Sequence, residues 1–230
     1  CESEPDKPMI LCEYCHSMGN GAGDYEDYFE MIETYDCLCG GFIWEWCDHA
    51  IYKGKAANGK GIYYYGGDHG EYPNDGNFCM DGMVYPDRTP HTGLLEYKNV
   101  HRPVRVVSYN QTEGIVLLKN EMNYLSLQEY LDVAYQVTCD GTLMESGRLD
   151  LTEVPAIKPH QTGNVQLSVS APERGRVYLK LIYHLKHADA FRSQGYELGF
   201  DEILLENVDG SNRRVTDWIN SNIENAEVIE

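Results

Sequence analysis

Hydrophobic positions recur with two different periods along the chain. In the first hundred residues, short apolar runs such as Met9–Cys12 and Phe42–Trp46 alternate with loops rich in Gly, Asn, Asp and aromatic residues. Between these runs, apolar side chains recur every three or four residues from Asp24 to Tyr35, which predicts a helix with one apolar face. Strand, helix and strand in so short a span are typical of a βαβ unit with parallel strands. A further extended segment is expected at Ile62–Tyr65, and a further helix at Leu94–Val100.

The second half reads as short strands separated by turn residues. Asp140-Gly141 between two strand patterns predicts a two-residue hairpin turn. The pattern favours an antiparallel sandwich of immunoglobulin-like type. The expected strands are Val104–Tyr109, Ile115–Asn120, Tyr130–Cys139, Thr142–Glu145, Arg148–Val154, Val165–Ala171, Val177–Leu185 and Phe200–Glu206.

We therefore predict an α/β region followed by an all-β region. The expected boundaries are residues 1–100, 101–212 for the sandwich, and 213–230 for a linker or the start of another domain, with a short helix at Val215–Ile223. A (β/α)₈ barrel takes about 250 residues by itself, so two parallel strands cannot close one. Either the first half folds around the sandwich, or it supplies the last strands and helices of a barrel whose earlier strands are absent.

Charge and composition narrow the class of partner. The formal net charge is −19, from 37 acidic and 18 basic residues. Such a surface repels phosphate backbones and anionic lipids, so neither nucleic acid nor membrane is an expected partner. The apolar runs are too short to span a bilayer, and the polar N-terminal segment does not resemble a signal peptide, which favours a cytoplasmic location. The 18 tyrosines offer apolar faces with a polar edge, which suit sugars.

Seven of the eight cysteines lie in the first 79 residues. Cys12 and Cys15 form a C-x-x-C pair, and Cys37 and Cys39 form a C-x-C pair, so a structural zinc site is one interpretation. The spacing differs from that of zinc ribbons, and the first pair brackets the end of an apolar strand. We favour reduced, partly buried thiols.

A carboxylate at the end of a buried strand is costly unless it has a function. Glu13 occupies such a position, and retaining glycosidases need two carboxyl groups about 5–5.5 Å apart. Glu45, at the end of the next strand, is a second candidate. Side chains alternate along a strand, however, so Trp44 and Glu45 point in opposite directions. If Trp44 faces the site, Glu45 faces the surrounding layer.

Three segments resemble the β-galactosidases of glycoside hydrolase family 2. They read MILCEYCHSMGNGAGD, GGFIWEWCDHAI and YGGDHGEYPNDGNFCMDGMVYPDRTPH. The resemblance extends more weakly through YQVTCDGTLMESGRLDL and GYELGFDEILL in the second half. It implies that Glu13 is the nucleophile, that His16 contacts galactose hydroxyls, and that Trp44 is an aromatic platform for the sugar.

The same resemblance implies a monovalent cation beside the sugar. In the family, the backbone carbonyl of Phe78 and the side chain at position 81 hold Na⁺ or K⁺, and position 81 also contacts substrate. Well-known members carry Asn there, whereas this chain carries Asp81. Tyr14, Asn74 and Asp75 are expected to shape the site, although Pro-Asn-Asp-Gly is also good turn chemistry. The family's Mg²⁺ ligands are expected outside this chain. Three other polar residues of these loops are assigned no role: Asp68, His69 and His91.

The resemblance implies a fragment of a retaining β-galactosidase that hydrolyses terminal β-D-galactosides, such as lactose, through a covalent galactosyl-Glu13 intermediate. The family's acid/base glutamate lies on an earlier strand, so we expect the fragment alone to be inactive. Expected partners are the galactoside, the remainder of the parent enzyme and further copies of it in a homo-oligomer. Three alternatives stay open: a non-catalytic carbohydrate-binding or docking module, a family 2 enzyme for another sugar, and a zinc-stabilised interaction domain.

Overall fold

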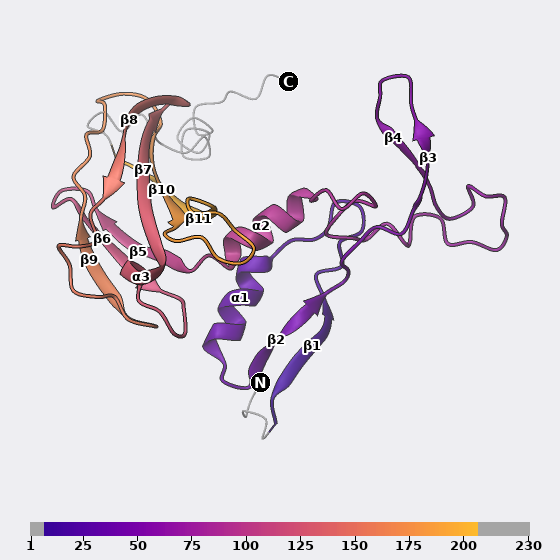
Figure 1. Cartoon of the computed structure of the whole chain (residues 1–230), viewed down its shortest axis with the longest axis horizontal. Helices are drawn as coiled ribbons and strands as arrows, with labels where there is room; N and C mark the ends of the chain where they lie inside the picture. Colours follow the sequence, from indigo (N-terminus) through magenta and orange to yellow (C-terminus); the bar gives the residue numbers. More distant parts are fainter. Residues whose placement is uncertain (1–6, 207–230) are drawn as a thin grey trace, which may run out of the picture. The chain divides into compact units, whose positions relative to one another are not determined.

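The computed structural model describes residues 7–206, which contain eleven strands and three helices (Figure 1). The chain divides between His101 and Arg102 into two compact units, called unit 1 and unit 2 below. The expected helix at Val215–Ile223 and the segment 213–230 lie outside the described residues. Within residues 7–206, no helix combines the length and apolar character needed to cross a membrane.

Unit 1 begins with a strand, a helix and a second strand. These are β1 (Met9–Tyr14), α1 (Tyr25–Thr34) and β2 (Leu38–Ile43), and β1 pairs with β2 in parallel. The predicted parallel βαβ arrangement is therefore confirmed. The second strand begins and ends earlier than predicted, so that Trp44 and Glu45 follow β2 instead of lying within it.

The prediction of a buried first strand is wrong for the part of the chain described. Met9 is 43% exposed and Ile10 is 59% exposed. The physical reason is that β1 and β2 form a two-stranded sheet, with no further strand of residues 7–206 paired to it. Helix α1 packs against β2 and against α2 (Thr92–Val100), so the pair is covered on one side only.

A hairpin follows the βαβ segment. Strand β3 (Ile51–Lys55) pairs antiparallel with β4 (Gly61–Tyr64), which confirms the extended segment expected near residues 62–65. The sequence reading missed β3, because the alternation in IYKGK is interrupted by Gly54. The small core of unit 1 lies elsewhere, around the buried side chains of Tyr25, Met83 and Val100.

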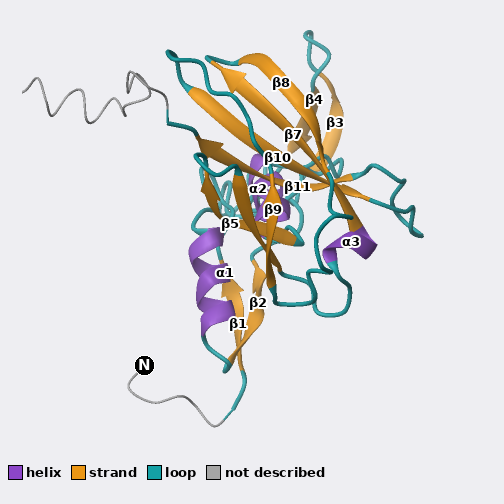
Figure 2. Cartoon of the chain, turned by 90° about the vertical axis from the view of Figure 1, so that its left-hand side faces the viewer, coloured by secondary structure: helices purple, strands orange, loops and turns teal. Residues whose placement is uncertain are grey.

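Unit 2 contains two antiparallel sheets. One has the order β11–β10–β7–β8 and the other the order β5–β6–β9 (Figure 1 and Figure 2). The strands are β5 (Val104–Asn110), β6 (Ile115–Asn120), β7 (Leu131–Cys139), β8 (Thr142–Leu149), β9 (Thr162–Gln166), β10 (Val177–Leu185) and β11 (Glu197–Leu204). Both sheets contribute to one hydrophobic core, and β10 alternates buried and half-buried residues along its whole length. This period of two is expected for a strand with one face on the core.

Several expected boundaries in unit 2 are corrected. The two strands predicted at Thr142–Glu145 and Arg148–Val154 are a single strand, β8, so seven strands are found here among residues 7–206, not eight. Gly147 does not interrupt β8; it lies opposite Tyr135, where an added Cβ would come within 2.6 Å of the tyrosine ring. Strands β9 and β11 begin three residues earlier than predicted.

A short helix, α3 (Leu127–Tyr130), was not predicted (Figure 2). It begins with a capping box, in which the Glu129 carboxylate accepts hydrogen bonds from the Ser126 backbone N–H at 2.9 Å and the Ser126 hydroxyl at 2.5 Å. The hairpin turn between β7 and β8 is as predicted, with Asp140 and Gly141 both at positive φ.

Candidate functional site

Five of the predicted site residues, Glu13, Tyr14, His16, Trp44 and Phe78, line an open pocket of about 500 Å³ in unit 1, whereas Asn74, Asp75 and Asp81 are not part of its lining. Its lining comprises Glu13, Tyr14, Cys15, His16, Trp44 and Phe78. Glu13 and Tyr14 are the last residues of β1, and Trp44 directly follows β2. Because the two strands are parallel, their carboxyl ends meet at one edge, where active sites of barrel enzymes lie.

Asp81 connects two of these residues from beneath the pocket. Its Oδ2 accepts a hydrogen bond from the Trp44 indole N–H at 3.0 Å and lies 3.2 Å from His16 Nε2. Asp81 is 2% exposed, whereas the side chain of His16 is 41% exposed. One buried carboxylate oxygen therefore fixes the orientation of an aromatic ring and of an imidazole at the same pocket. The Phe78 ring lies against His16, with centroids 5.9 Å apart.

The other oxygen of Asp81 tests whether these residues fit the expected cation. Asp81 Oδ1 is buried, and the Asp81 carboxyl neighbours that of Glu45; with both groups ionised, Oδ1 accepts no hydrogen bond in the described part of the chain. A buried carboxylate oxygen without a partner is costly, and a bound cation would compensate it. Carbonyl and carboxylate oxygens are suitable ligands for hard cations. The donor set of Phe78 and Asp81 thus fits a monovalent cation.

Glu13 stands apart from this network. Its side chain is exposed, and it has no hydrogen bond or ion pair to another residue of the described ranges. Glu45, the other candidate carboxylate, is outside the pocket lining and lies 3.4 Å from His49 Nε2. Burial, followed by a side-chain hydrogen bond with the Asp81 carboxyl, raises the pKa of Glu45. The arrangement offers one free carboxylate at the pocket, not a pair.

Tyr14 and Cys15 line the pocket from the side of the helices. The Tyr14 ring packs on Tyr28 of α1 at 4.8 Å between centroids, and burial is the main cause that raises the Tyr14 pKa. The Cys15 thiol donates to the carbonyl of Gly23 at 3.1 Å. Burial, and secondarily the charge of Asp24, raises the pKa of Cys15 to about 11. The raised pKa favours the protonated thiol at physiological pH, which disfavours a nucleophilic role for Cys15.

Asn74 and Asp75, expected to shape the site, do not line this pocket. Asn74 instead holds a turn: its amide donates to the Glu71 carbonyl at 3.1 Å, and its side-chain oxygen accepts from the Gly76 N–H at 3.1 Å. The carbonyl of Asp75 accepts from the Phe78 N–H at 3.3 Å. Asn74 and Asp75 are linked to the pocket through the backbone of the turn that leads to Phe78.

The cysteine pairs do not assemble a metal centre in the region described. All seven described cysteines are free thiols, and residues 7–206 contain no cluster of three or more His, Cys, Asp or Glu side chains placed to hold a metal ion. Cys12 and Cys39 are exposed, and Cys15 faces Gly23.

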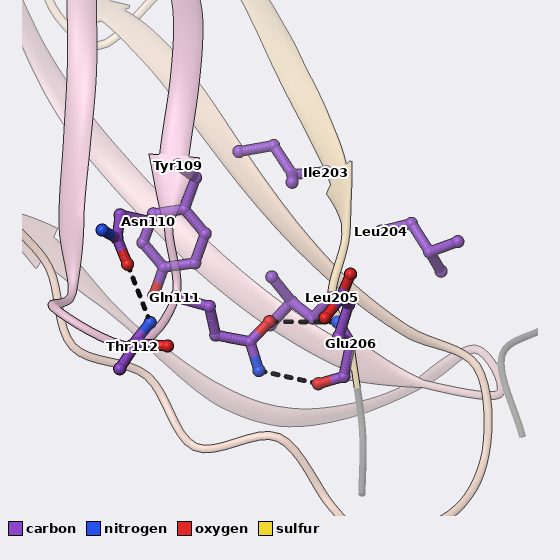
Figure 3. Close-up of a pocket in the computed structure, with 8 residues that line it drawn as sticks. All are labelled: Tyr109, Asn110, Gln111, Thr112, Ile203, Leu204, Leu205 and Glu206. Atoms are coloured by element: carbon purple, nitrogen blue, oxygen red, sulfur yellow. Dashed lines mark hydrogen bonds between the residues drawn. The ribbon is translucent and has the colours of Figure 1, made fainter. Parts of the chain in front are cut away.

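A larger pocket of about 600 Å³ lies in unit 2, between the turn after β5 and the end of β11 (Figure 3). None of the predicted site residues lines it. Its most ordered feature is a pair of hydrogen bonds in which the Gln111 amide binds the backbone of Glu206, at 2.7 and 3.0 Å (Figure 3). This side-chain amide ties the turn after β5 to the residues after β11, which belong to different sheets, and that is a structural role.

Sequence reasoning missed a pair formed by the buried Asp48 and the half-buried His91, which is linked to the pocket residues through the Asp81–Gly82 peptide. Asp48, 4% exposed, binds His91 Nε2 at 2.8 Å through Oδ2 and the Gly82 N–H at 2.9 Å through Oδ1. Asp48 and His91 are 43 residues apart, and neither stands in a recognisable short motif. The signal available in the sequence was the position of Asp48, a carboxylate that directly follows the largely apolar run 42–47.

Comparison with known proteins agrees with the two units. Residues 1–106 match the family model for the TIM barrel domain of glycosyl hydrolases family 2, and residues 116–206 match that for domain 4 of β-galactosidase.

Three relatives illustrate the extent of the similarity. The β-galactosidase of Staphylococcus xylosus is 42% identical over 205 residues, which are 87% of this chain and 20% of the relative. That of Actinobacillus pleuropneumoniae is 41% identical over 207 residues, covering 89% of this chain and 19% of the relative. That of Priestia megaterium is 34% identical over 201 residues, covering 87% and 19%. The chain spans about a fifth of the length of these curated relatives. With both family models matched in sequence order, the chain belongs to glycosyl hydrolase family 2.

Proposed function

We propose that this chain supplies the nucleophile side of the active site of a retaining β-galactosidase that acts on terminal β-D-galactosides such as lactose. One observation carries the proposal: Glu13, His16 and Trp44 line one pocket, and a single oxygen of Asp81 binds both His16 and Trp44. The named relatives are β-galactosidases, which favours galactose over other sugars.

In the first step, a Glu13 carboxylate oxygen attacks the anomeric carbon and forms a glycosyl ester. The bond from that carbon to the leaving oxygen breaks, and an acid residue donates a proton to the leaving oxygen. In the second step, the same residue removes a proton from water, which attacks the anomeric carbon and releases Glu13. The acid/base residue is a carboxylic acid on a strand outside this chain, so residues 1–230 alone are inactive.

The neighbours of Glu13 position the sugar. The Trp44 ring offers an apolar face to the carbon side of a galactose ring, and its indole N–H is already engaged by Asp81. The exposed His16 imidazole is available to ring hydroxyls, and Asp81 restrains its orientation. Glu13, with no internal partner in the described region, is left free to attack.

A monovalent cation, Na⁺ or K⁺, bound by the Phe78 carbonyl and Asp81 would supply positive charge beside the sugar hydroxyls. Asp81 Oδ1, buried and unpaired within residues 7–206, supports this assignment. The carboxylate of Asp81 carries a negative charge, which such an ion would balance. A neutral amide at this position would need no cation for charge balance. The Mg²⁺ site of the parent enzyme has its ligands outside this chain.

The larger assembly follows from the same proposal. Unit 1 provides the closing strands and helices of a (β/α)₈ barrel, and unit 2 is the immunoglobulin-like sandwich that comes next. The exposed apolar side chains of β1 and β2 are covered by the remainder of a cytoplasmic, homo-oligomeric parent enzyme.

The test uses a full-length β-galactosidase that carries residues 7–206. A 2-fluoro-galactoside with a good leaving group should label Glu13, identified by peptide mass spectrometry, and Glu13→Gln should abolish both labelling and turnover. Glu113→Gln, in the exposed turn after β5, is the matched control and should behave as the parent. A label on any other residue overturns the proposal.

A second experiment distinguishes the catalytic proposal from a non-catalytic sugar-binding module. Isothermal titration of the isolated chain with galactose and lactose, repeated with Trp44→Ala, is decisive. Micromolar affinity that survives Trp44→Ala would indicate a binding module with its site elsewhere.

A further inference from the structure

We propose that Asp48 and His91 are positioning residues for the candidate site, because they hold the peptide that carries Asp81. The structural part of this inference concerns unit 1 alone. Its catalytic consequence rests on the proposed function of the pocket.

One peptide group, between Asp81 and Gly82, is held from both sides. Its carbonyl oxygen accepts a hydrogen bond from the backbone N–H of Glu45 at 2.8 Å. Its N–H, which belongs to Gly82, donates to Asp48 Oδ1 at 2.9 Å in a buried environment. With both ends bound, this peptide plane cannot rotate, and the direction in which the Asp81 side chain leaves the backbone is fixed. The Asp81 carboxylate then meets Trp44 and His16 at 3.0 and 3.2 Å.

Asp48 is itself fixed. Its backbone N–H donates to the Val84 carbonyl at 3.0 Å, and its Oδ2 binds His91 Nε2 at 2.8 Å. The His91 ring stacks on Tyr85, with centroids 3.6 Å apart and planes 27° apart. His91 immediately precedes α2, and its own N–H donates to the Met83 carbonyl at 3.0 Å. The imidazole therefore holds the carboxylate from a helix end, and the carboxylate holds the Asp81–Gly82 peptide.

The surroundings of Gly82 show how closely the loop after Phe78 approaches the segment after β2. A Cβ at this position would collide with the backbone of Cys47 and Asp48. Two further backbone bonds continue the contact, from Met83 N–H to the Glu45 carbonyl at 2.8 Å and from Val84 N–H to the Trp46 carbonyl at 3.0 Å. The loop after Phe78 thus lies on the segment after β2, and Asp48 is the side chain that completes the contact beside Asp81.

Removal of the Asp48 carboxylate would leave the buried Gly82 N–H without an acceptor. An unsatisfied buried donor is costly, so the peptide would turn toward another acceptor or water. Asp81 would then lose its alignment with Trp44, and the oxygen assigned to the cation would move. Partners of this kind behind a metal ligand typically change metal affinity by about 10- to 100-fold.

The first experiment uses the chain itself. In a ¹H–¹⁵N correlation spectrum, the Trp44 indole N–H reports on its bond to Asp81, and the exposed indole of Trp46 is an internal reference. Asp48→Ala and His91→Ala should shift the Trp44 indole resonance, as Asp81→Ala does, and leave that of Trp46 in place. Asp48→Asn, which keeps an oxygen for Gly82, and His91→Gln should restore most of the original position. His160→Ala, which removes a histidine bonded to Asn123 in unit 2, is the matched control and should shift neither.

An unchanged Trp44 indole resonance in Asp48→Ala and His91→Ala overturns the inference. If Asp48→Ala unfolds unit 1, His91→Ala decides, because it keeps a carboxylate at position 48 as an acceptor for Gly82 and removes only the ring that orients this carboxylate.

The second experiment measures turnover against Na⁺ or K⁺ concentration in a full-length β-galactosidase carrying residues 7–206. Asp48→Ala should raise the half-saturating cation concentration roughly tenfold or more, with Asp48→Asn near the parent. A uniform loss of kcat at every cation concentration would indicate a merely structural role and overturn the positioning role. A fully active Glu13→Gln enzyme would overturn the proposed function instead, while the indole result would still stand.

Discussion

The two units bury different kinds of side chain. The core of unit 2 contains nineteen buried apolar residues, whereas the core cluster of unit 1 contains three, among the residues described. Unit 2 therefore derives its stability from one continuous hydrophobic core, and unit 1 relies on backbone hydrogen bonds around a polar centre.

The buried polar residues of the two units also differ. In unit 2, Asn120 is fully paired: its amide donates to the carbonyls of Leu125 and Ile157, and its oxygen accepts from the Met122 N–H. In unit 1, Asp81 is as deeply buried, yet one of its oxygens has no partner in residues 7–206. Unit 2 also has a buried carboxylate oxygen without a hydrogen bond in residues 7–206, Oε2 of Glu121, but Lys119 Nζ lies 3.0 Å from the other oxygen of that carboxylate and balances its charge. A buried carboxylate without such a lysine or arginine beside it marks a place where a cationic ligand is expected. The comparison assigns stability to unit 2 and chemistry to unit 1.

The largest effect on stability is expected at Asp201 in unit 2. This carboxylate accepts hydrogen bonds from Arg102, from the Val106 N–H and from the Tyr183 hydroxyl, the last at 2.5 Å. Asp201→Ala removes the ion pair with the mostly buried Arg102 guanidinium and takes this acceptor from the Val106 N–H and the Tyr183 hydroxyl, and removal of one member of such a buried pair costs about 3–5 kcal/mol in free energy of unfolding. Hydrogen exchange followed by mass spectrometry of unit 2 peptides measures the loss.

Asp189→Ala is the matched control for Asp201→Ala. Asp189 also pairs with an arginine, Arg192 at 2.5 Å, but in an exposed loop where ion pairs contribute little. Equal destabilisation by both variants would contradict the assignment of unit 2 stability to its buried network and core.

A second effect compares equivalent truncations in the two units. Leu181, in the middle of β10, is fully buried, and Leu181→Ala should cost about 2–5 kcal/mol in free energy of unfolding. Ile10 in β1 is 59% exposed, and Ile10→Ala should change the stability of the isolated chain by less than about 0.5 kcal/mol. Urea denaturation of the two variants, followed by circular dichroism, makes the comparison. A large loss for Ile10→Ala would show that β1 is buried in solution, for instance against a second copy.

The fold of unit 2 was largely predictable because most of its strands are short apolar runs separated by turn residues. Short apolar runs bounded by turn residues gave Val177–Leu185 and Ile115–Asn120 their observed limits, and Asp140-Gly141 marked the hairpin between β7 and β8. One exception arose where a glycine is required by a tertiary contact. Gly147 accommodates the Tyr135 ring and does not end β8. No local pattern reveals such a contact.

In unit 1, the sequence predicted which residues line the pocket more readily than what holds them. Glu13, His16 and Trp44 stand at strand ends, where the chain direction places them together. Asp48 and His91 required knowledge of how the loop after Phe78 lies on the segment after β2. Burial of β1 was predicted incorrectly, because an apolar run indicates a strand and does not tell whether neighbours cover it.

The smallest expected effect is the change with pH in the free energy of unfolding of unit 1. In an unfolded chain the Cys15 thiol has its ordinary pKa of 9.0, and burial raises the pKa to about 11 in the folded chain. Below pH 9 the thiol is protonated in both states and the folded state keeps its full stability. Between pH 9 and 11 the unfolded chain releases a proton that the folded chain retains, so the free energy of unfolding falls as pH rises. The interval from pH 9 to 10 is the most informative, because the ordinary tyrosine pKa of 10.0 lies at its upper end.

Across that interval, unit 1 should lose less than about 1 kcal/mol, since the unfolded thiol is already half ionised at pH 9 and the folded thiol is partly solvated. Urea denaturation at pH 8, 9 and 10, followed by tryptophan fluorescence, measures the loss, since two of the three tryptophans are Trp44 and Trp46. Cys15→Ala should reduce the pH dependence and leave the part that comes from Tyr14 and Tyr25, whose pKa values burial also raises, whereas Cys139→Ala in unit 2 should leave the pH dependence of the parent unchanged. An unchanged loss in Cys15→Ala would mean that another group titrates beside the pocket, and the neutral thiol would no longer distinguish unit 1 from unit 2.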